Sequence, residues 1–113
     1  MNAEHDEFPI GGISPHGGEL VNRVLFGQQR QEALARAHSL RRLSLTSAMS
    51  LSDLELLAVG AFSPLTGFMV RDDYERVVAE MRLYSDLVWS VPVTLAVTDD
   101  EAAGLAEGQD IAL

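Results

Sequence analysis

The sequence predicts an α+β fold in which several short helices pack on strands. Apolar residues recur at helical spacings in several segments between residues 20 and 81, and one long stretch, 87–98, alternates strictly between two faces. Glycines and prolines separate these segments. At 113 residues the chain is at most one domain, large enough for a modest core.

Composition narrows the class of protein. The chain is 47% hydrophobic, which is typical of a globular protein, and has no cysteine, which excludes a disulfide, a thiol nucleophile and a cysteine-ligated metal. A net charge of −9 disfavours nucleic-acid binding by the whole domain. No apolar run suits a bilayer span and the first residues lack signal-peptide features, so we expect a cytoplasmic protein without a membrane partner.

The N-terminal segments suggest a tail and a turn. Residues 1–12 are polar and acidic, and we expect a mobile tail. The stretch Pro15-His16-Gly17-Gly18 predicts a tight turn. His16 has the chemistry for acid/base work, but no partner is placed beside it in the sequence. We interpret His16 as a turn residue bonded to backbone.

Two helices and a strand are expected next. Residues 20–25 read as a short amphipathic helix closed by Gly27, and 28–38 as a second helix. The residues expected to face inward are Leu20, Val21, Val24 and Leu25, then Ala33, Leu34 and Ala37. His38 has no metal-ligand partner at helical spacing. Residues 43–46 alternate as a short strand does.

This region also concentrates positive charge. Arg23, Arg30, Arg36, Arg41 and Arg42 stand against only Glu32 between residues 20 and 50. The favoured interpretation is a solvated face that pairs with acidic neighbours. A site for an anion or a partner is the open alternative.

Ser50 to Asp53 predicts a capping box that begins a helix over Leu51–Val59, ended by Gly60. The residues expected to be buried are Leu51, Leu54, Leu57 and Ala58. Asp53 and Glu55 are two positions apart on a helix and point in different directions. They are therefore not an acid/base pair, and capping is the role expected for Asp53.

A third helix is expected to open at Asp72 and Asp73, whose charges favour the positive helix end and need no cation. Its inward residues are expected to be Tyr74, Val77, Val78 and Met81. Residues 87–98 then predict a strand, which Pro92 makes an edge or bulged strand. Thr98 to Glu101 is a second capping box for a weak helix that Gly104 destabilises and Gly108 ends, and residues 110–113 begin another strand.

The most distinctive stretch is Gly-Ala-Phe-Ser-Pro-Leu-Thr-Gly-Phe-Met at residues 60–69. Gly60 and Gly67 are expected to supply backbone angles closed to other residues, and Pro64 fixes one dihedral. Phe62, Leu65, Phe68 and Met69 need burial. The stretch predicts a shaped, packed connector.

This connector, called the signature loop below, closely resembles a motif of the ATP sulfurylase (sulfate adenylyltransferase) family, in its N-terminal domain. Further resemblances follow in the family's order, at residues 15–18 with Leu20, at 53–55, at Tyr74 with 81–83, and at Trp89 with 92–95. They cover residues 13–113. The family usually has a glycine where this chain has Asp86, and aspartate tolerates the left-handed turn better than most residues.

The resemblance implies an incomplete PUA-like β-barrel with several short helices packed on it. Residues 13–113 would be the N-terminal domain, truncated before its last strands, and the separate catalytic domain would be absent. A chain ending in a strand leaves unpaired backbone groups. We therefore expect the isolated chain to be marginally stable or to associate through that edge.

The implied reaction is attack of sulfate on the α-phosphorus of Mg·ATP, giving adenylyl sulfate and pyrophosphate. The family's Gln-x-Arg-Asn-Pro and His-Pro-x-x-Gly motifs are absent, and a chain without lysine has no Walker-type loop. We therefore assign no catalytic, cofactor-binding or metal residue here, and expect the fragment to be inactive. Mg·ATP is implied for the full enzyme, the catalytic domain as partner, and a homo-oligomer for the full protein.

Two other classes remain open. A stand-alone PUA-like module would bind RNA or a protein partner, although the acidity argues against RNA. A scaffold remnant that binds a separately encoded catalytic domain is the second.

Overall fold

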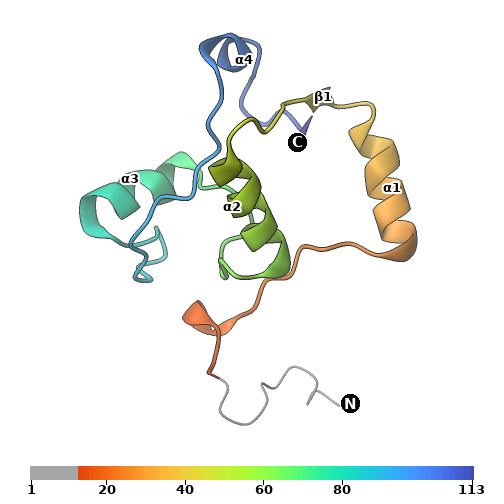
Figure 1. Ribbon diagram of the computed structural model, residues 1–113. Coiled ribbons are helices and arrows are strands. Elements are labelled where there is room, and N and C mark those ends of the chain that lie inside the picture. Colours follow the sequence, from red (N-terminus) through yellow and green to blue (C-terminus); the bar gives the residue numbers. More distant parts are fainter. Residues whose placement is uncertain (1–12) are drawn as a thin grey trace.

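The computed structural model describes residues 13–113, and the tail expected over residues 1–12 lies outside them (Figure 1). The elements in order are the 3-10 helix η2 (His16–Gly18), α1 (Gly27–Ala37), β1 (Arg41–Arg42), α2 (Ala48–Val59), α3 (Arg71–Glu80), α4 (Asp99–Ala103) and β2 (Ile111–Ala112). Helices and strands are both present, as the α+β prediction requires.

The two strands lie far apart in sequence and side by side in space. β1 pairs with β2 in parallel, with Arg41 opposite Ile111 and Arg42 opposite Ala112, which brings the C-terminal end next to β1 (Figure 1). Within residues 13–113 this is the whole sheet, so a β-barrel is not observed there.

The core lies between α2, α3 and the chain that follows each of them. It consists of Leu57, Leu65, Val77, Leu83, Trp89 and Val93, with Phe62, Phe68, Met69 and Leu87 partly buried against it. Val77 and Val93 are its most deeply buried side chains, at 2% and 1% exposed. The four apolar residues of the signature loop are therefore packed, as predicted, while α1 and α4 contribute no buried residue.

The prediction of a helix over residues 20–25 is wrong. This segment is extended, because its backbone donors bond to other parts of the chain: Val21 N–H donates to Ser63 Oγ and Arg23 N–H to the carbonyl of Ala58, both at 2.8 Å. Leu20, Val24 and Leu25 are exposed instead of buried. Gly27 begins α1 and does not close a helix before it.

The helix expected over residues 28–38 is confirmed as α1, but its inward face is wrong. Leu34 is 43% exposed and no residue of α1 is buried. The strand expected over residues 43–46 lies two residues earlier, in β1. Leu43 N–H still donates to the carbonyl of Ala112 at 2.8 Å, and the Leu43 side chain is buried.

The start of α2 also differs from the prediction. The N-cap is Ser47, whose Oγ accepts from the N–H of Ser50 at 2.9 Å, so the capping role expected for Asp53 is wrong. A run of serines offers several caps, and Ala48 and Met49 favour the earlier start. Leu57 is buried and Gly60 ends the helix as expected, whereas Leu51 is exposed.

α3 opens at Arg71 with Asp72 and Asp73 in its first turn, which confirms their helix-end position. Of its expected apolar face only Val77 is buried. Tyr74 and Val78 are exposed, and Met81 is an exposed C-cap in the left-handed region.

Residues 87–98 form an extended segment without a continuous ladder. Its contacts with neighbouring chain are a single bridge between Val88 and Arg82 and hydrogen bonds such as Met69 N–H to the carbonyl of Val93 at 2.8 Å. On the face of the predicted alternation that holds Trp89 and Val93, these two residues are buried, but Val91 and Val97 are exposed. The strand as a hydrogen-bonded element is not observed among the described residues.

The last two elements, α4 and β2, agree more closely with the sequence prediction. Thr98 and Glu101 form the predicted capping box at the start of α4. The helix ends at Ala103 with Gly104 as its cap, four residues before the expected Gly108. The strand expected over residues 110–113 is present as β2.

Candidate functional site

The signature loop, residues 60–69, connects α2 to α3 and lies against the core. Gly60 adopts φ 88°, a left-handed conformation. A Cβ at this position would lie 3.0 Å from both Leu20 Cδ1 and the carbonyl oxygen of Val21. Both the dihedral and the contact therefore favour glycine. Gly67 has no positive φ and nothing near its Cβ position, so the prediction that it supplies a closed angle is wrong.

Ser63 ties this loop to the N-terminal segment. Its buried hydroxyl donates to the carbonyl of Gly60 at 2.7 Å and accepts from the N–H of Val21 at 2.8 Å. The following Ser63–Pro64 peptide is cis. The hydroxyl has both roles occupied, so it is a structural group and not a nucleophile.

His16 lies where the sequence interpretation placed it. Its Nε2–H donates to the carbonyl of Val88 at 2.6 Å, which confirms a turn histidine bonded to backbone. The imidazole centroid lies 5.9 Å from that of Trp89, and the ring of Phe62 meets Trp89 edge-on at 6.0 Å. Trp89 thus joins η2, the signature loop and the extended segment.

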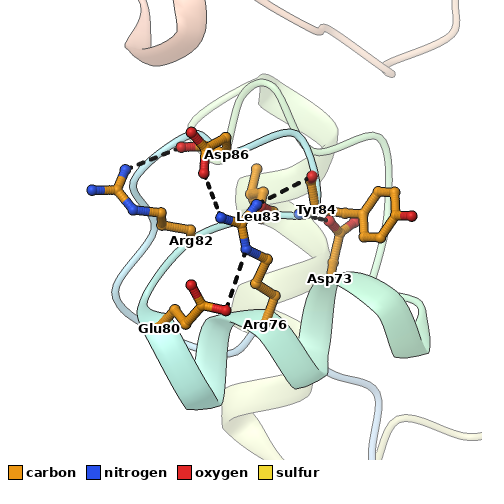
Figure 2. A network of polar contacts seen from close by, with 7 residues as sticks. All are labelled: Asp73, Arg76, Glu80, Arg82, Leu83, Tyr84 and Asp86. Carbon is orange, nitrogen blue, oxygen red and sulfur yellow. Dashed lines mark hydrogen bonds and ion pairs between the residues drawn. The ribbon is translucent and has the colours of Figure 1, made fainter.

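The turn after α3 is held by charged groups (Figure 2). The Arg76 guanidinium donates to the carbonyls of Leu83 and Tyr84 at 3.1 and 3.3 Å, and pairs with Asp86. Glu80 lies 3.7 Å from Arg76 Nε. One arginine therefore fixes both the turn and its carboxylate.

A second pair of contacts holds the same turn from either side. Arg82 donates to the backbone carbonyl of Asp86 at 3.1 Å, and Asp73 of α3 accepts from the N–H of Tyr84 at 2.8 Å (Figure 2). Asp73 therefore has a backbone partner besides its helix-end position, and no cation is needed to explain it.

The pairing shifts the titration of both partners. The hydrogen bond and the positive charge of Arg76 hold the pKa of Asp86 below its ordinary value, and Asp86 in turn raises the pKa of Arg76. Asp86 has φ 82°, which confirms the expected left-handed residue in this turn. The network stabilises a turn and leaves no carboxylate placed for proton transfer.

The histidine and carboxylate side chains of residues 13–113 form no metal-ligand cluster. Among residues 13–113 no three histidine, aspartate or glutamate side chains converge as ligands. Asp53 and Glu55 lie on α2 and His38 caps α1. No described helix combines the length and apolarity of a bilayer span; the longest, α2, has 12 residues.

Two arginines of the basic segment, residues 23–42, contact residues near the C-terminal end of the chain. Arg36 pairs with Asp110, and Arg41 donates to the carbonyl of Glu101 at 3.2 Å while its guanidinium covers Gly104. The pair of Arg36 with Asp110 supports the interpretation of paired surface charge, whereas Arg41 bonds to a backbone carbonyl. An anion or partner site elsewhere in the segment stays a prediction.

Open hollows lie beside α3. One of about 600 Å³ is lined by Phe68, Met69, Val70, Arg71, Tyr74, Glu75, Thr94 and Leu95. It carries one positive and one negative side chain and no histidine. Nothing in this lining points to a reaction.

Comparison with known proteins identifies the class of domain. Residues 13–113 match the family described as PUA-like domain, and the chain belongs to this family.

The chain is similar to sulfate adenylyltransferases. It is 54% identical over 96 residues to that of Nostoc punctiforme and 56% identical over 101 residues to that of Symbiobacterium thermophilum, which confirms the resemblance drawn from the motifs. These alignments cover 85% and 89% of this chain but 24% and 25% of the relatives. The chain therefore spans about a quarter of their length.

A solved structure shares the fold. It is that of a hexameric APS kinase from Thiobacillus denitrificans, and superposes with a TM-score of 0.74 at 39% identity. The match covers 86% of this chain and 19% of that one.

The structural roles of two side chains, Arg76 and Ser63, were not predicted from the sequence. Arg76 was not singled out, although an arginine five residues into an acidic-capped helix and ten before Asp86 is compatible with such a pairing. Ser63 was read only as part of a motif. Its role depends on Val21, 42 positions away, and no local pattern links the two.

Proposed function

We propose that residues 13–113 are the N-terminal supporting domain of a sulfate adenylyltransferase and hold none of its catalytic residues. The observation that carries this proposal is identity above 50% to enzymes of that name over about a quarter of their length. The polar groups described between residues 13 and 113 support it, because Ser63, His16 and Arg76 are all engaged in holding backbone.

The proposal extends to the remainder of such an enzyme. Further strands would complete the PUA-like barrel, and a separate catalytic domain would bind sulfate and Mg·ATP and release pyrophosphate. The supporting domain would pack on that partner in a cytoplasmic homo-oligomer. The hexameric state of the similar APS kinase favours an assembly of several subunits.

A chimaeric enzyme tests this function. Residues 13–113 should replace the matching quarter of the Nostoc punctiforme enzyme and give a protein that releases pyrophosphate from ATP only when sulfate is present. A matched chimaera carrying Val93→Asp, which places a charge in the core, should be insoluble or inactive. The 113-residue chain alone should release none.

Three outcomes would contradict the proposal. A soluble, folded chimaera without activity would mean that these residues do not support the catalytic domain. Turnover by the isolated chain, abolished by a substitution at His16, would place catalysis within it. Salt-dependent binding of a structured RNA by the chain would favour the stand-alone module.

A further inference from the structure

Helix α1 is separated from the core of its own chain. It has no buried residue, and Figure 1 shows it carried away from α2 by the extended segments on either side. A helix of 11 residues is marginal in water unless an amphipathic face is packed. Its exposed face therefore calls for a partner surface.

The exposed face of α1 carries a pattern that we call the α1 stripe: Phe26, Arg30 and Leu34. Phe26 is the N-cap, and Arg30 follows one turn later, with its N–H bonded to the carbonyl of Phe26 at 3.4 Å. Phe26 is 73% exposed and Leu34 43%. Residues four apart lie on one side of a helix, so this stripe is apolar at both ends and positive at its centre.

Helix α2 carries the complementary pattern, the α2 stripe: Leu51, Glu55 and Val59. The spacing is the same four and four, and all three side chains are exposed, Leu51 at 50% and Val59 at 58%. This stripe is apolar at both ends and negative at its centre. Each stripe covers about 12 Å along its helix, at 1.5 Å per residue.

We propose that the α1 stripe of one chain docks on the α2 stripe of a second copy, with Arg30 against Glu55. Because each charge stands midway between two apolar residues, this pair meets whether the helices run parallel or antiparallel. Every chain has both stripes, so in a two-fold dimer the contact is made twice, once by the α1 of each copy. The exposure of both stripes shows that they do not cover each other within one chain.

Charge selects this arrangement over the contact of α1 with α1. Five arginines and Glu32 give residues 20–42 a formal charge of +4, so the rest of a chain with total charge −9 carries −13. Two basic segments repel each other, whereas each is attracted to the acidic remainder of the other copy. The occupant that fits the α1 stripe is therefore a second copy's α2.

Sedimentation velocity over a concentration series, with single and double charge reversals, tests the proposal. The natural chain should shift from monomer to dimer as concentration rises. Arg30→Glu and Glu55→Arg should each weaken the dimer about tenfold or more, because symmetry repeats the like-charge contact twice. The double variant restores opposite charges and should recover most of the lost affinity.

Matched controls separate this contact from a general charge effect. Arg71→Glu and Glu107→Arg change the net charge equally, lie on neither stripe, and should leave the dimer unchanged. Circular dichroism should report the same helix content for all variants. In Phe26→Asp, which keeps Arg30 but puts a charge in the apolar end, the dimer should be lost as well.

Other results would overturn the proposal. A natural chain that stays monomeric throughout would show that neither stripe binds a second copy. A dimer indifferent to both single reversals would place the interface elsewhere, for example at a strand edge. Single reversals that weaken the dimer without recovery in the double variant would show that Arg30 and Glu55 do not meet.

Discussion

The hydroxyl of Ser63 joins two segments that are 42 positions apart, because its Oγ accepts a hydrogen bond from the N–H of Val21 at 2.8 Å. The same hydroxyl donates to the carbonyl of Gly60 at 2.7 Å. The signature loop thereby holds the extended N-terminal segment against the end of α2.

Ser63→Ala should lower the free energy of unfolding by about 1–3 kcal/mol, because it leaves the N–H of Val21 without its partner and removes one of the two hydrogen bonds to the Gly60 carbonyl. Urea denaturation measures the change. The control is Ser85→Ala, which alters an exposed serine in the turn after α3 and should change stability little. Equal effects of the two substitutions would mean that the Ser63 contacts do not contribute.

The contrast between Ser63 and the motifs around it marks what the sequence could predict. Local patterns correctly predicted α1, α3 and the Thr98 capping box, and the family resemblance predicted the left-handed turn at Asp86. Local patterns failed over residues 20–25, where the apolar spacing fits a helix but Ser63 and Ala58 take the backbone donors. Tertiary hydrogen bonds override local propensity there, and a local pattern contains no information about them.

The extended segment 87–98 gives a second lesson. Alternation placed Trp89 and Val93 on one face, and both are buried, but Val91 on the same face is 51% exposed, so burial follows the two-residue period only in part. Alternation could not predict the ladder, since hydrogen bonds depend on which neighbour lies alongside. For the site, the family motifs predicted the importance of the signature loop, whereas the Arg76 network depends on a turn whose geometry is not local to α3.

Val93→Ala should lower the free energy of unfolding by about 1–3 kcal/mol, because Val93 is 1% exposed and truncation leaves a cavity beside Val77 and Trp89. Val91→Ala is the matched control, since Val91 is 51% exposed on the same segment. Thermal unfolding followed by tryptophan fluorescence measures both. A larger loss for Val91 would contradict the burial pattern of this segment.

The pairing of Arg76 with Asp86 makes stability depend on pH in the acidic range. The pKa of Asp86 is held below the ordinary 3.8, so the carboxylate contributes stability above 3.8 that is lost as the pH falls through the lower folded value. In Asp86→Asn, which keeps a residue that tolerates φ 82°, that part of the pH dependence should vanish.

Urea midpoints between about pH 5 and pH 2 measure this effect, since that window spans the ordinary and lowered carboxylate values. Glu107→Gln removes an exposed carboxylate in the loop before β2 and serves as the control. Because Asp86 is largely exposed, the difference between the natural chain and Asp86→Asn should be small and should shrink in high salt. A profile that Asp86→Asn leaves unchanged would mean that the pair contributes nothing in solution.

Gly60→Ala should destabilise the chain more than any other glycine-to-alanine change in the signature loop. The left-handed φ of 88° costs a residue with a side chain about 1–2 kcal/mol, and displacing the Val21 carbonyl or Leu20 adds to that cost. Gly67→Ala is the matched control, because Gly67 has no positive φ and open space at its Cβ position. There the loss of unfolded-chain entropy should make alanine neutral or stabilising by up to about 1 kcal/mol. Chemical denaturation of the two variants side by side measures the difference, and a Gly67→Ala protein that is the less stable of the pair would contradict the backbone geometry of the loop.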